Sequence, residues 1–156
     1  MDLRDARDDD APRLIELIGA IWDEYPGCVM DVDGEVPELW RIASAHAELG
    51  GEFWVAEREA RIVGCVGWVP AGECGVELRK LYVAASARRT GLGAALCERV
   101  ERAAGGADFV ELWSDTRFED AHRLYERRGY RRGPHTRELH DLSSTVEYYY
   151  RLDLSA

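Results

Sequence analysis

The sequence predicts a mixed α/β (α+β) fold whose sheet contains both antiparallel and parallel strands. Three β-type runs, at 53–57, 62–69 and 76–83, follow one another with short turn-like pieces between them, which predicts an antiparallel meander. A helical stripe at 92–103 and an apolar run at 108–114 come next, so the third strand also begins a strand–helix–strand unit. The two strands of such a unit lie parallel, with a right-handed crossover between them.

The remaining elements follow from the same periodicities. Apolar residues at 14–25 recur with the spacing of one helix face, and a proline two residues earlier suits the first turn of a helix. A second helix is expected at 38–49, and a stripe at 121–128 predicts the last helix, before a glycine. The tail at 132–154 predicts two more strands, the second at 146–152. The pattern therefore contains about four helices.

Length and composition are those of one globular domain spanning residues 1–156. The 156 residues are 46% hydrophobic and 32% charged, and a domain of this size buries roughly two thirds of its unfolded surface. Thirty acidic residues against twenty basic ones give a net charge of −10, which opposes binding to nucleic acid or to anionic membranes. The longest apolar runs are far shorter than the roughly 20 residues of a bilayer span, so we expect a cytoplasmic protein.

The cysteines predict neither a metal site nor a disulfide. No C-x-x-C pair occurs among the four, and three of them lie in apolar or glycine-flanked stretches typical of small core residues. They are Cys28, Cys65, Cys74 and Cys97. A cysteine–histidine nucleophile is also disfavoured, because no predicted element brings a histidine near Cys74.

The loop before the third helix has the composition of an anion-binding site. It reads Arg88-Arg89-Thr90-Gly91-Leu92-Gly93. Unpaired backbone N–H groups and the positive end of a helix dipole meet here, the glycines allow close approach of a bulky group, and the two arginines add donors. Thr90 is either a further donor or the helix cap. We therefore expect the loop to bind a diphosphate. The alternative is an ordinary helix start whose glycines serve packing.

Two other phosphate-binding motifs fit less well. In a nicotinamide dinucleotide fold Asp115, 22 residues past Gly93, would hold the ribose, but Leu96 stands where the third glycine belongs. The stretch from Val83 to Gly91 is also too long for that fold, and three meander strands precede the unit. No Gly-Lys-Ser/Thr sequence follows the loop, which excludes a Walker loop.

Two stretches together resemble the GNAT superfamily of acyl-CoA-dependent N-acetyltransferases. The first is the Arg-x-x-Gly-x-Gly loop after a strand that ends Leu81-Tyr82-Val83, and the second runs from 121 to 130 and reads AHRLYERRGY. The element order is also that of the family, so the resemblance covers nearly the whole chain. It implies a mostly antiparallel seven-stranded sheet with a splayed parallel pair in its middle. The stretch 116–120 departs from the family, many members of which have an asparagine at its start.

The resemblance implies acetyl-CoA as the cofactor, with no metal, and assigns residues to it. The backbone groups of Leu81, Tyr82 and Val83 would pair with the pantetheine arm, because a strand whose neighbour splays away has unpaired N–H and C=O groups. One of these N–H groups would also stabilise the thioester oxygen as it becomes an oxyanion. The diphosphate would lie against Arg88, Arg89, Thr90, Gly91, Leu92 and Gly93.

Two side chains are expected to handle protons in this chemistry. Glu77 lies on the strand of the cofactor contacts with the same side-chain parity as Leu81, and it matches the position where some family members keep a base. Its alternative role is that of a strand carboxylate paired with an arginine. Tyr125 is the expected acid for the departing thiolate, or else one more member of the apolar stripe. His122 and Ser114 lie nearby and are expected to be surface or capping residues.

The acceptor pocket is expected among the first two helices and the last two strands, as in similar proteins. Residues there are acidic and aromatic, which suits a cationic acceptor such as a small polyamine, an amino sugar or a peptide amine. The candidates are Trp22, Tyr25, Asp31 and Asp33. Two functions stay open: an N-acetyltransferase that works by direct attack in a ternary complex, and a noncatalytic acyl-CoA-binding sensor or interaction module. Similar proteins are often homodimers, which makes a homodimer an expectation of the resemblance.

Overall fold

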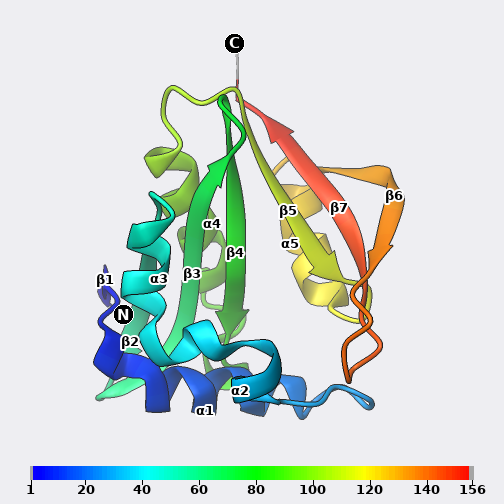
Figure 1. Ribbon diagram of the computed structural model, residues 1–156. Coiled ribbons are helices and arrows are strands. Elements are labelled where there is room, and N and C mark those ends of the chain that lie inside the picture. Colours follow the sequence, from blue (N-terminus) through cyan, green and yellow to red (C-terminus); the bar gives the residue numbers. More distant parts are fainter. Residues whose placement is uncertain (1, 155–156) are drawn as a thin grey trace.

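The computed structural model describes residues 2–154, which form a seven-stranded mixed sheet (Figure 1). The strands are β1 (Asp2–Asp5), β2 (Glu52–Arg58), β3 (Arg61–Ala71), β4 (Gly75–Val83), β5 (Phe109–Asp115), β6 (Arg131–Glu138) and β7 (Val146–Asp153). Their spatial order is β1-β2-β3-β4-β5-β7-β6, and every neighbouring pair is antiparallel except β4 and β5, which run parallel. The expected fold class is confirmed, including the first strand, which only the family resemblance implied.

Five α-helices accompany the sheet within residues 2–154, one more than the sequence pattern predicts. They are α1 (Ala11–Trp22), α2 (Val32–Glu35), α3 (Ile42–Glu48), α4 (Leu92–Ala103) and α5 (Glu119–Arg127), with 3-10 turns η1 (Asp8–Asp10), η2 (Pro37–Arg41) and η3 (Ala85–Ala87). The additional helix α2 is a single turn too short for an apolar stripe, and the Asp31 carboxylate caps it by accepting from Gly34 N at 3.2 Å. The helix expected at 38–49 begins as the turn η2, so only its second part is α3.

Two hydrophobic cores lie on opposite faces of the sheet. In β2, Phe53 and Val55 pack with α1, whereas Trp54 and Ala56 pack with α4 on the other face, as the alternation of side chains along a strand requires. Figure 1 shows α1, α2 and α3 on one side of the sheet and α4 and α5 on the other. Because both faces of the central strands are covered, these strands appear in the sequence as nearly continuous apolar runs.

The parallel pair in the middle of the sheet separates after one short stretch of pairing. β4 and β5 pair only where Gly75–Glu77 meets Phe109–Glu111, and beyond these residues the two strands diverge (Figure 1). Among the described residues, the side of β4 that faces β5 therefore has no strand partner from 78 to 83. Backbone N–H and C=O groups on that side are left for a ligand or for water. The expected splay is thus confirmed.

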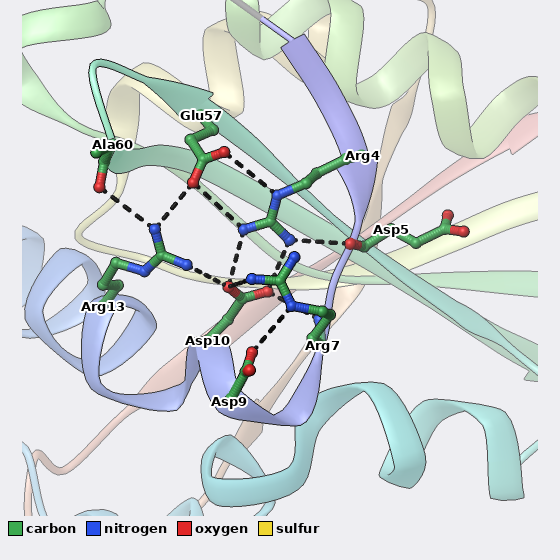
Figure 2. A network of polar contacts seen from close by, with 8 residues as sticks. All are labelled: Arg4, Asp5, Arg7, Asp9, Asp10, Arg13, Glu57 and Ala60. Atoms are coloured by element: carbon green, nitrogen blue, oxygen red, sulfur yellow. Dashed lines mark hydrogen bonds and ion pairs between the residues drawn. The ribbon is translucent and has the colours of Figure 1, made fainter.

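A buried carboxylate fixes the start of α1 against the edge of the sheet. Asp10 accepts two hydrogen bonds from the Arg4 guanidinium group at 2.8 and 2.9 Å, one from Arg13 at 2.7 Å and one from Arg7 N at 2.8 Å (Figure 2). Glu57 on β2 contacts the guanidinium groups of Arg4 and Arg13 at 3.4 and 2.9 Å. Burial alone would raise the pKa of Asp10, but the hydrogen bonds from Arg4 and from Arg7 N outweigh it and hold the pKa at about 2. The network therefore sets the position of the helix that leads to the candidate site.

We expect Asp10→Asn to lower the free energy of unfolding by about 3 kcal/mol at pH 7, because it removes the buried charge that three arginines surround. The pKa of Asp10 lies below that of a free carboxyl, so its contribution is complete above about pH 4 and is lost as the pH falls toward 2. Urea denaturation at pH 7 and pH 3 measures this, and the difference between variant and wild type should be smaller at pH 3.

The control for Asp10→Asn is Glu98→Gln. This variant removes an exposed ion pair with Arg102 on α4, which should change the free energy of unfolding by less than about 0.5 kcal/mol. Equal losses in the two variants would show that the burial of Asp10 is irrelevant to its contribution.

Candidate functional site

The loop and the strand that the sequence assigns to a cofactor line one cavity. This first cavity has a volume of about 680 Å³ and lies between the end of β4, the start of α4 and α5. Eight of the nine predicted cofactor residues line it, namely Leu81, Tyr82, Val83, Arg88, Arg89, Gly91, Leu92 and Gly93. The structure thus brings the two predicted halves of the cofactor site together.

The two glycines of the loop have different surroundings. Gly91 precedes α4 with φ +84°, a left-handed conformation that favours glycine, and a Cβ atom there would meet no described atom within 4 Å. A Cβ atom on Gly93 would lie 2.9 Å from Leu124 Cδ2, so this glycine allows α4 to approach α5. Gly91 therefore borders open space, whereas Gly93 both lines the first cavity and lies against Leu124 of α5.

Thr90 takes neither of the roles that the sequence predicts for it, and it does not line the first cavity. Its hydroxyl donates to the carbonyl oxygen of Ala87 at 2.6 Å, and the N-cap residue of α4 is Gly91. This hydrogen bond connects Thr90 to the last residue of η3. The donors that the loop offers to a ligand are therefore backbone N–H groups and the side chains of Arg88 and Arg89.

Arg88 forms a bidentate ion pair with Glu24, which lies just after α1, at 2.6 and 2.7 Å. The hydrogen bond from Arg88 lowers the pKa of Glu24, so the carboxylate is charged at neutral pH. The two side chains are 31% and 37% exposed. An anion that enters the first cavity must therefore compete with Glu24 for this guanidinium group, whereas Arg89 beside it is exposed to solvent.

A second cavity, of about 550 Å³, lies beside α1, α2 and the segment between β6 and β7. Its acidic lining residues are Glu35, Glu38, Glu77, Asp115, Asp141 and Glu147, and its lysine and arginine residues are Arg79, Lys80 and Arg137. All three of the basic side chains are already paired, Lys80 with Glu38 at 2.8 Å, Arg137 with Glu147 at 2.7 Å and Arg79 with Glu77 at 3.3 Å. Carboxylates thus outnumber cations in this cavity, which favours a positively charged ligand.

The four residues that the sequence assigns to the acceptor are not brought together. Trp22 lines the second cavity and Tyr25 lines the first. Asp31 and Asp33 line neither, because Asp31 caps α2 and Asp33 accepts a hydrogen bond from Trp40 Nε1 at 2.8 Å. The acidic character expected of the pocket comes from other residues.

A bulge in β4 places Glu77 on the opposite face of the sheet from Leu81. Between paired positions 79 and 82, β4 has two residues where β3 has one, and Lys80 in the bulge has φ +53°. The bulge reverses the side-chain parity, so Leu81 and Val83 pack with the core under α4, whereas Glu77 and Tyr82 share the face toward α1. The predicted parity of Glu77 with Leu81 is therefore wrong.

Glu77 nevertheless lines the second cavity. Its carboxylate lies 3.3 Å from Arg79 Nε and accepts a long hydrogen bond from Arg79 Nη2 at 3.4 Å. The sequence left open the alternative that Glu77 is a strand carboxylate paired with an arginine. The structure shows this contact with Arg79, and it also places Glu77 in the lining of the second cavity. Because the contacts with Arg79 are long, the carboxylate keeps the capacity to accept a stronger hydrogen bond.

Tyr125 both packs in a core and lines the second cavity. Its ring contacts Tyr130 and Tyr150, with ring centroids 5.7 and 5.6 Å away, and its side chain is almost fully buried. Burial raises the pKa of Tyr125 well above its usual value, so the phenol stays protonated at neutral pH. Tyr125 therefore belongs to the apolar stripe of α5 and also lines the second cavity.

His122 and Ser114 are both buried, so neither is at the surface, which was one of the two roles, surface or capping, expected of them. His122 Nε2 lies 2.9 Å from the carbonyl oxygen of Asp115, and its ring stacks on Tyr150 with centroids 5.7 Å apart. Burial lowers the pKa of His122, which keeps the imidazole neutral. This histidine therefore links α5 to the end of β5.

The two cavities meet at four residues that line both of them, Leu81, Tyr82, Phe118 and Ala121. Tyr82 is held there by a hydrogen bond from Trp22 Nε1 to its hydroxyl at 3.1 Å. Phe118 is an additional residue of the junction, which no pattern in the sequence predicts. The departure of the stretch 116–120 from the family pattern is the one feature of the sequence that points to it.

These features together define a site for two ligands in the gap of a splayed sheet. The first cavity offers an anion-binding helix start and an unpaired strand edge, which suit a long donor with phosphate and amide groups. The second cavity is acid-lined and reaches the same junction, which suits a cationic acceptor. The fold and the site are those of a protein that can hold two different ligands side by side.

Comparison with known proteins identifies the family of this protein. Residues 50–132 match the Acetyltransferase (GNAT) domain family, and the chain belongs to the GNAT acetyltransferases. Over 111 residues it is 32% identical to N-acetyltransferase 8 of Homo sapiens, a match that covers 67% of this chain and 47% of that protein. The chain thus spans about half the length of this curated relative.

Solved structures of GNAT proteins share the whole fold. The acetyltransferase of the GNAT family from Staphylococcus aureus Mu50 has a TM-score of 0.84 at 22% identity, over 99% of both chains. The acetyltransferase yncA from Salmonella typhimurium, solved with its cofactor acetyl-CoA, has a TM-score of 0.70 at 19% identity and covers 100% of this chain and 95% of its own. The resemblance seen in the sequence is thereby confirmed.

Three further observations concern residues 2–154 as a whole. They contain no group of three or more histidine, cysteine or acidic side chains placed to hold a metal ion. Every helix in this range is too short or too polar to cross a membrane. The cysteines Cys28, Cys65, Cys74 and Cys97 are free thiols.

Proposed function

We propose that this protein transfers an acetyl group from acetyl-CoA to a primary amine. The observation that carries the proposal is the meeting of two chemically different cavities at the unpaired end of β4. Membership of the family supports acetyl transfer, and the chemistry of each cavity supports the proposed donor and acceptor.

The first cavity fits the chemistry of coenzyme A. Backbone N–H groups at the start of α4, with Arg88 and Arg89 beside them, suit a diphosphate. The unpaired edge of β4 from Leu81 to Val83 suits the amide groups of a pantetheine arm. When bound, acetyl-CoA supplies an acyl carbon activated as a thioester.

Glu77 and Tyr125 are the side chains that we propose to move protons. An alkyl amine has a pKa near 10.4, so nearly all of it is protonated at neutral pH and needs a base before it attacks. Glu77 accepts the amine proton, directly or through water, and Tyr125 holds the proton that the leaving thiolate takes up. The amine would form the N–C bond first, while a backbone N–H at the unpaired edge of β4 would stabilise the negative charge that develops on the thioester oxygen, and the C–S bond would then break to release the thiolate.

The acidic lining of the second cavity favours a cationic acceptor. Of the six carboxylates that line it, four form ion pairs with Arg79, Lys80, Arg137 and, outside the lining, Arg117. The remaining two, Glu35 and Asp141, give the cavity the excess negative charge that attracts a protonated amine and repels an anionic one. Trp22 adds an aromatic face on which the carbon frame of an amine packs. A small polyamine, an amino sugar and a peptide amine are the proposed acceptor classes.

Release of free thiol from acetyl-CoA in the presence of a panel of amines tests the proposed function. The panel contains a polyamine, an aminoglycoside, a lysine-containing peptide and, as an acidic comparison, glutamate. We expect release with at least one cationic amine, and a reaction without acceptor corrects for the exposed thiol of Cys74. Binding of acetyl-CoA with no thiol release by any amine would contradict transfer and support the noncatalytic sensor or module.

We expect Glu24→Gln to tighten the binding of coenzyme A by about threefold, because the diphosphate then no longer competes with a carboxylate for Arg88. Titration calorimetry at low salt measures the dissociation constant, and the gain should shrink as salt screens the charges. Glu98→Gln, which removes a carboxylate of the same charge outside both cavities, should leave the affinity unchanged. Weaker binding by Glu24→Gln would show that Glu24 holds Arg88 in place for the ligand rather than competing for it.

A further inference from the structure

Three aromatic rings from three elements close the junction between the two cavities. The ring of Phe118, in the turn before α5, lies 4.9 Å from that of Tyr25, which follows α1, and 6.3 Å from that of Tyr82 on β4, measured between centroids. Tyr25 lines the first cavity, whereas Phe118 and Tyr82 line both. We name these three residues the aromatic wall.

Hydrogen bonds hold the aromatic wall in place on both sides. Trp22 Nε1 donates to the Tyr82 hydroxyl at 3.1 Å. The turn that carries Phe118 is fixed by Asp115, whose carboxylate accepts from Arg117 N, Nε and Nη2 at 2.8 to 2.9 Å. Phe118 N also donates to the carbonyl oxygen of Asp115 at 3.1 Å. These hydrogen bonds hold the backbone of Phe118 and the ring of Tyr82. We therefore expect the side chains of the aromatic wall to move little when a larger group approaches them.

The junction itself is apolar. The other two residues that line both cavities are Leu81 and Ala121, so no charged side chain belongs to the shared lining. An acyl group that is held from the first cavity and attacked from the second lies at this junction, and its chain packs against these side chains. A hydrophobic pocket discriminates between chains that differ by one methylene by roughly tenfold or more.

We propose that Phe118 sets the upper limit on the length of the acyl chain that the protein transfers. This inference rests on the proposed function, which places the reacting acyl group at the junction. In this proposal an acetyl group lies beside the aromatic wall, and a longer chain such as butyryl would meet the Phe118 ring, which lies 4.9 Å from the Tyr25 ring and 6.3 Å from the Tyr82 ring. Phe118 is therefore a specificity residue, and it takes no part in proton transfer.

Binding of acetyl-CoA and butyryl-CoA to the full chain, measured by titration calorimetry without an acceptor, tests this role. In the wild type, we expect acetyl-CoA to bind at least about tenfold more tightly than butyryl-CoA. Phe118→Ala should abolish or reverse this preference, and Phe118→Leu should give an intermediate ratio. Phe109→Ala, which removes the same ring at the other end of β5 and outside both cavities, should keep the wild-type ratio.

Equal binding of the two thioesters by the wild type, or an unchanged preference in Phe118→Ala, would overturn the proposal. Circular dichroism establishes that the variants are folded, and if the alanine variant is not, Phe118→Leu decides the question in the same way. The result is separable from that of the amine panel. Failure of thiol release with every amine refutes transfer but leaves the binding ratio measurable, whereas a wild type that binds no acetyl-CoA overturns both proposals.

Discussion

We expect Glu77→Gln to lower kcat for acetyl transfer at pH 7.5 by about 100-fold or more, because the carboxamide has the shape of the carboxylate but could not accept the amine proton that the proposed mechanism assigns to Glu77. KM for acetyl-CoA stays close to the wild-type value, since Glu77 lies in the second cavity and not in the first. The loss should shrink between pH 7.5 and pH 9.5, where a growing fraction of the amine is already deprotonated. Steady-state rates with the best acceptor of the panel, measured across this pH range, check both expectations.

The matched control for Glu77→Gln is Glu111→Gln. Glu111 is the register partner of Glu77 on β5 and lines neither cavity, and its carboxylate accepts a hydrogen bond from the Tyr149 hydroxyl at 3.1 Å. This variant removes the same charge from the neighbouring strand, so it should keep kcat within about twofold. A similar loss in the two variants would mean that the charge of the sheet, and not a proton acceptor at Glu77, determines the rate.

We also expect Tyr125→Phe to lower kcat by about 100-fold, because the leaving thiolate would lose the proposed proton donor while the ring keeps its packing. The raised pKa of the buried phenol keeps it protonated over the whole working range, so the wild-type rate should show no decline near pH 10 that is due to Tyr125. Single-turnover measurements with saturating acetyl-CoA separate this chemical step from product release.

Tyr130→Phe is the matched control for Tyr125→Phe. Tyr130 belongs to the same core, and its hydroxyl donates to Glu101 at 3.1 Å outside both cavities. Loss of that hydrogen bond should lower stability by about 1 kcal/mol and leave kcat unchanged. If Tyr125→Phe changes stability but not the single-turnover rate, the phenol is a core residue and the proton of the thiolate comes from elsewhere.

Features of the site whose causes are local could be predicted from the sequence. The positive φ of Gly91, the helix that starts after it and the two arginines beside it lie within six consecutive residues, so the anion-binding loop follows from them. The meander and the crossover are local in the same sense, since the strand and helix periods are visible in short windows. The order of these elements then carried the resemblance to the family.

Features that depend on contacts between distant segments could not be predicted in this way. The bulge at Lys80 has no glycine or proline to mark it, so counting along the strand put Glu77 on the wrong face. Phe118 becomes a site residue only because α1 and β4 bring Tyr25 and Tyr82 to it. Neither the bulge nor the aromatic wall leaves a repeating pattern of apolar residues in the sequence. Both depend on which residues of neighbouring strands pair, and a single sequence does not give that pairing.

The divergence of β4 from β5 has a consequence for the integrity of the ligand-free protein. Open strand edges of soluble proteins readily recruit other polypeptides. Here the edge lies inside the molecule, between strands that still pair at one end, so it admits a thin, flexible molecule more easily than a second chain. Coenzyme A bound along this edge would then pair with β4 as a neighbouring strand does. We therefore expect the end of β4 to be more stable against local unfolding when coenzyme A is bound than in the free protein.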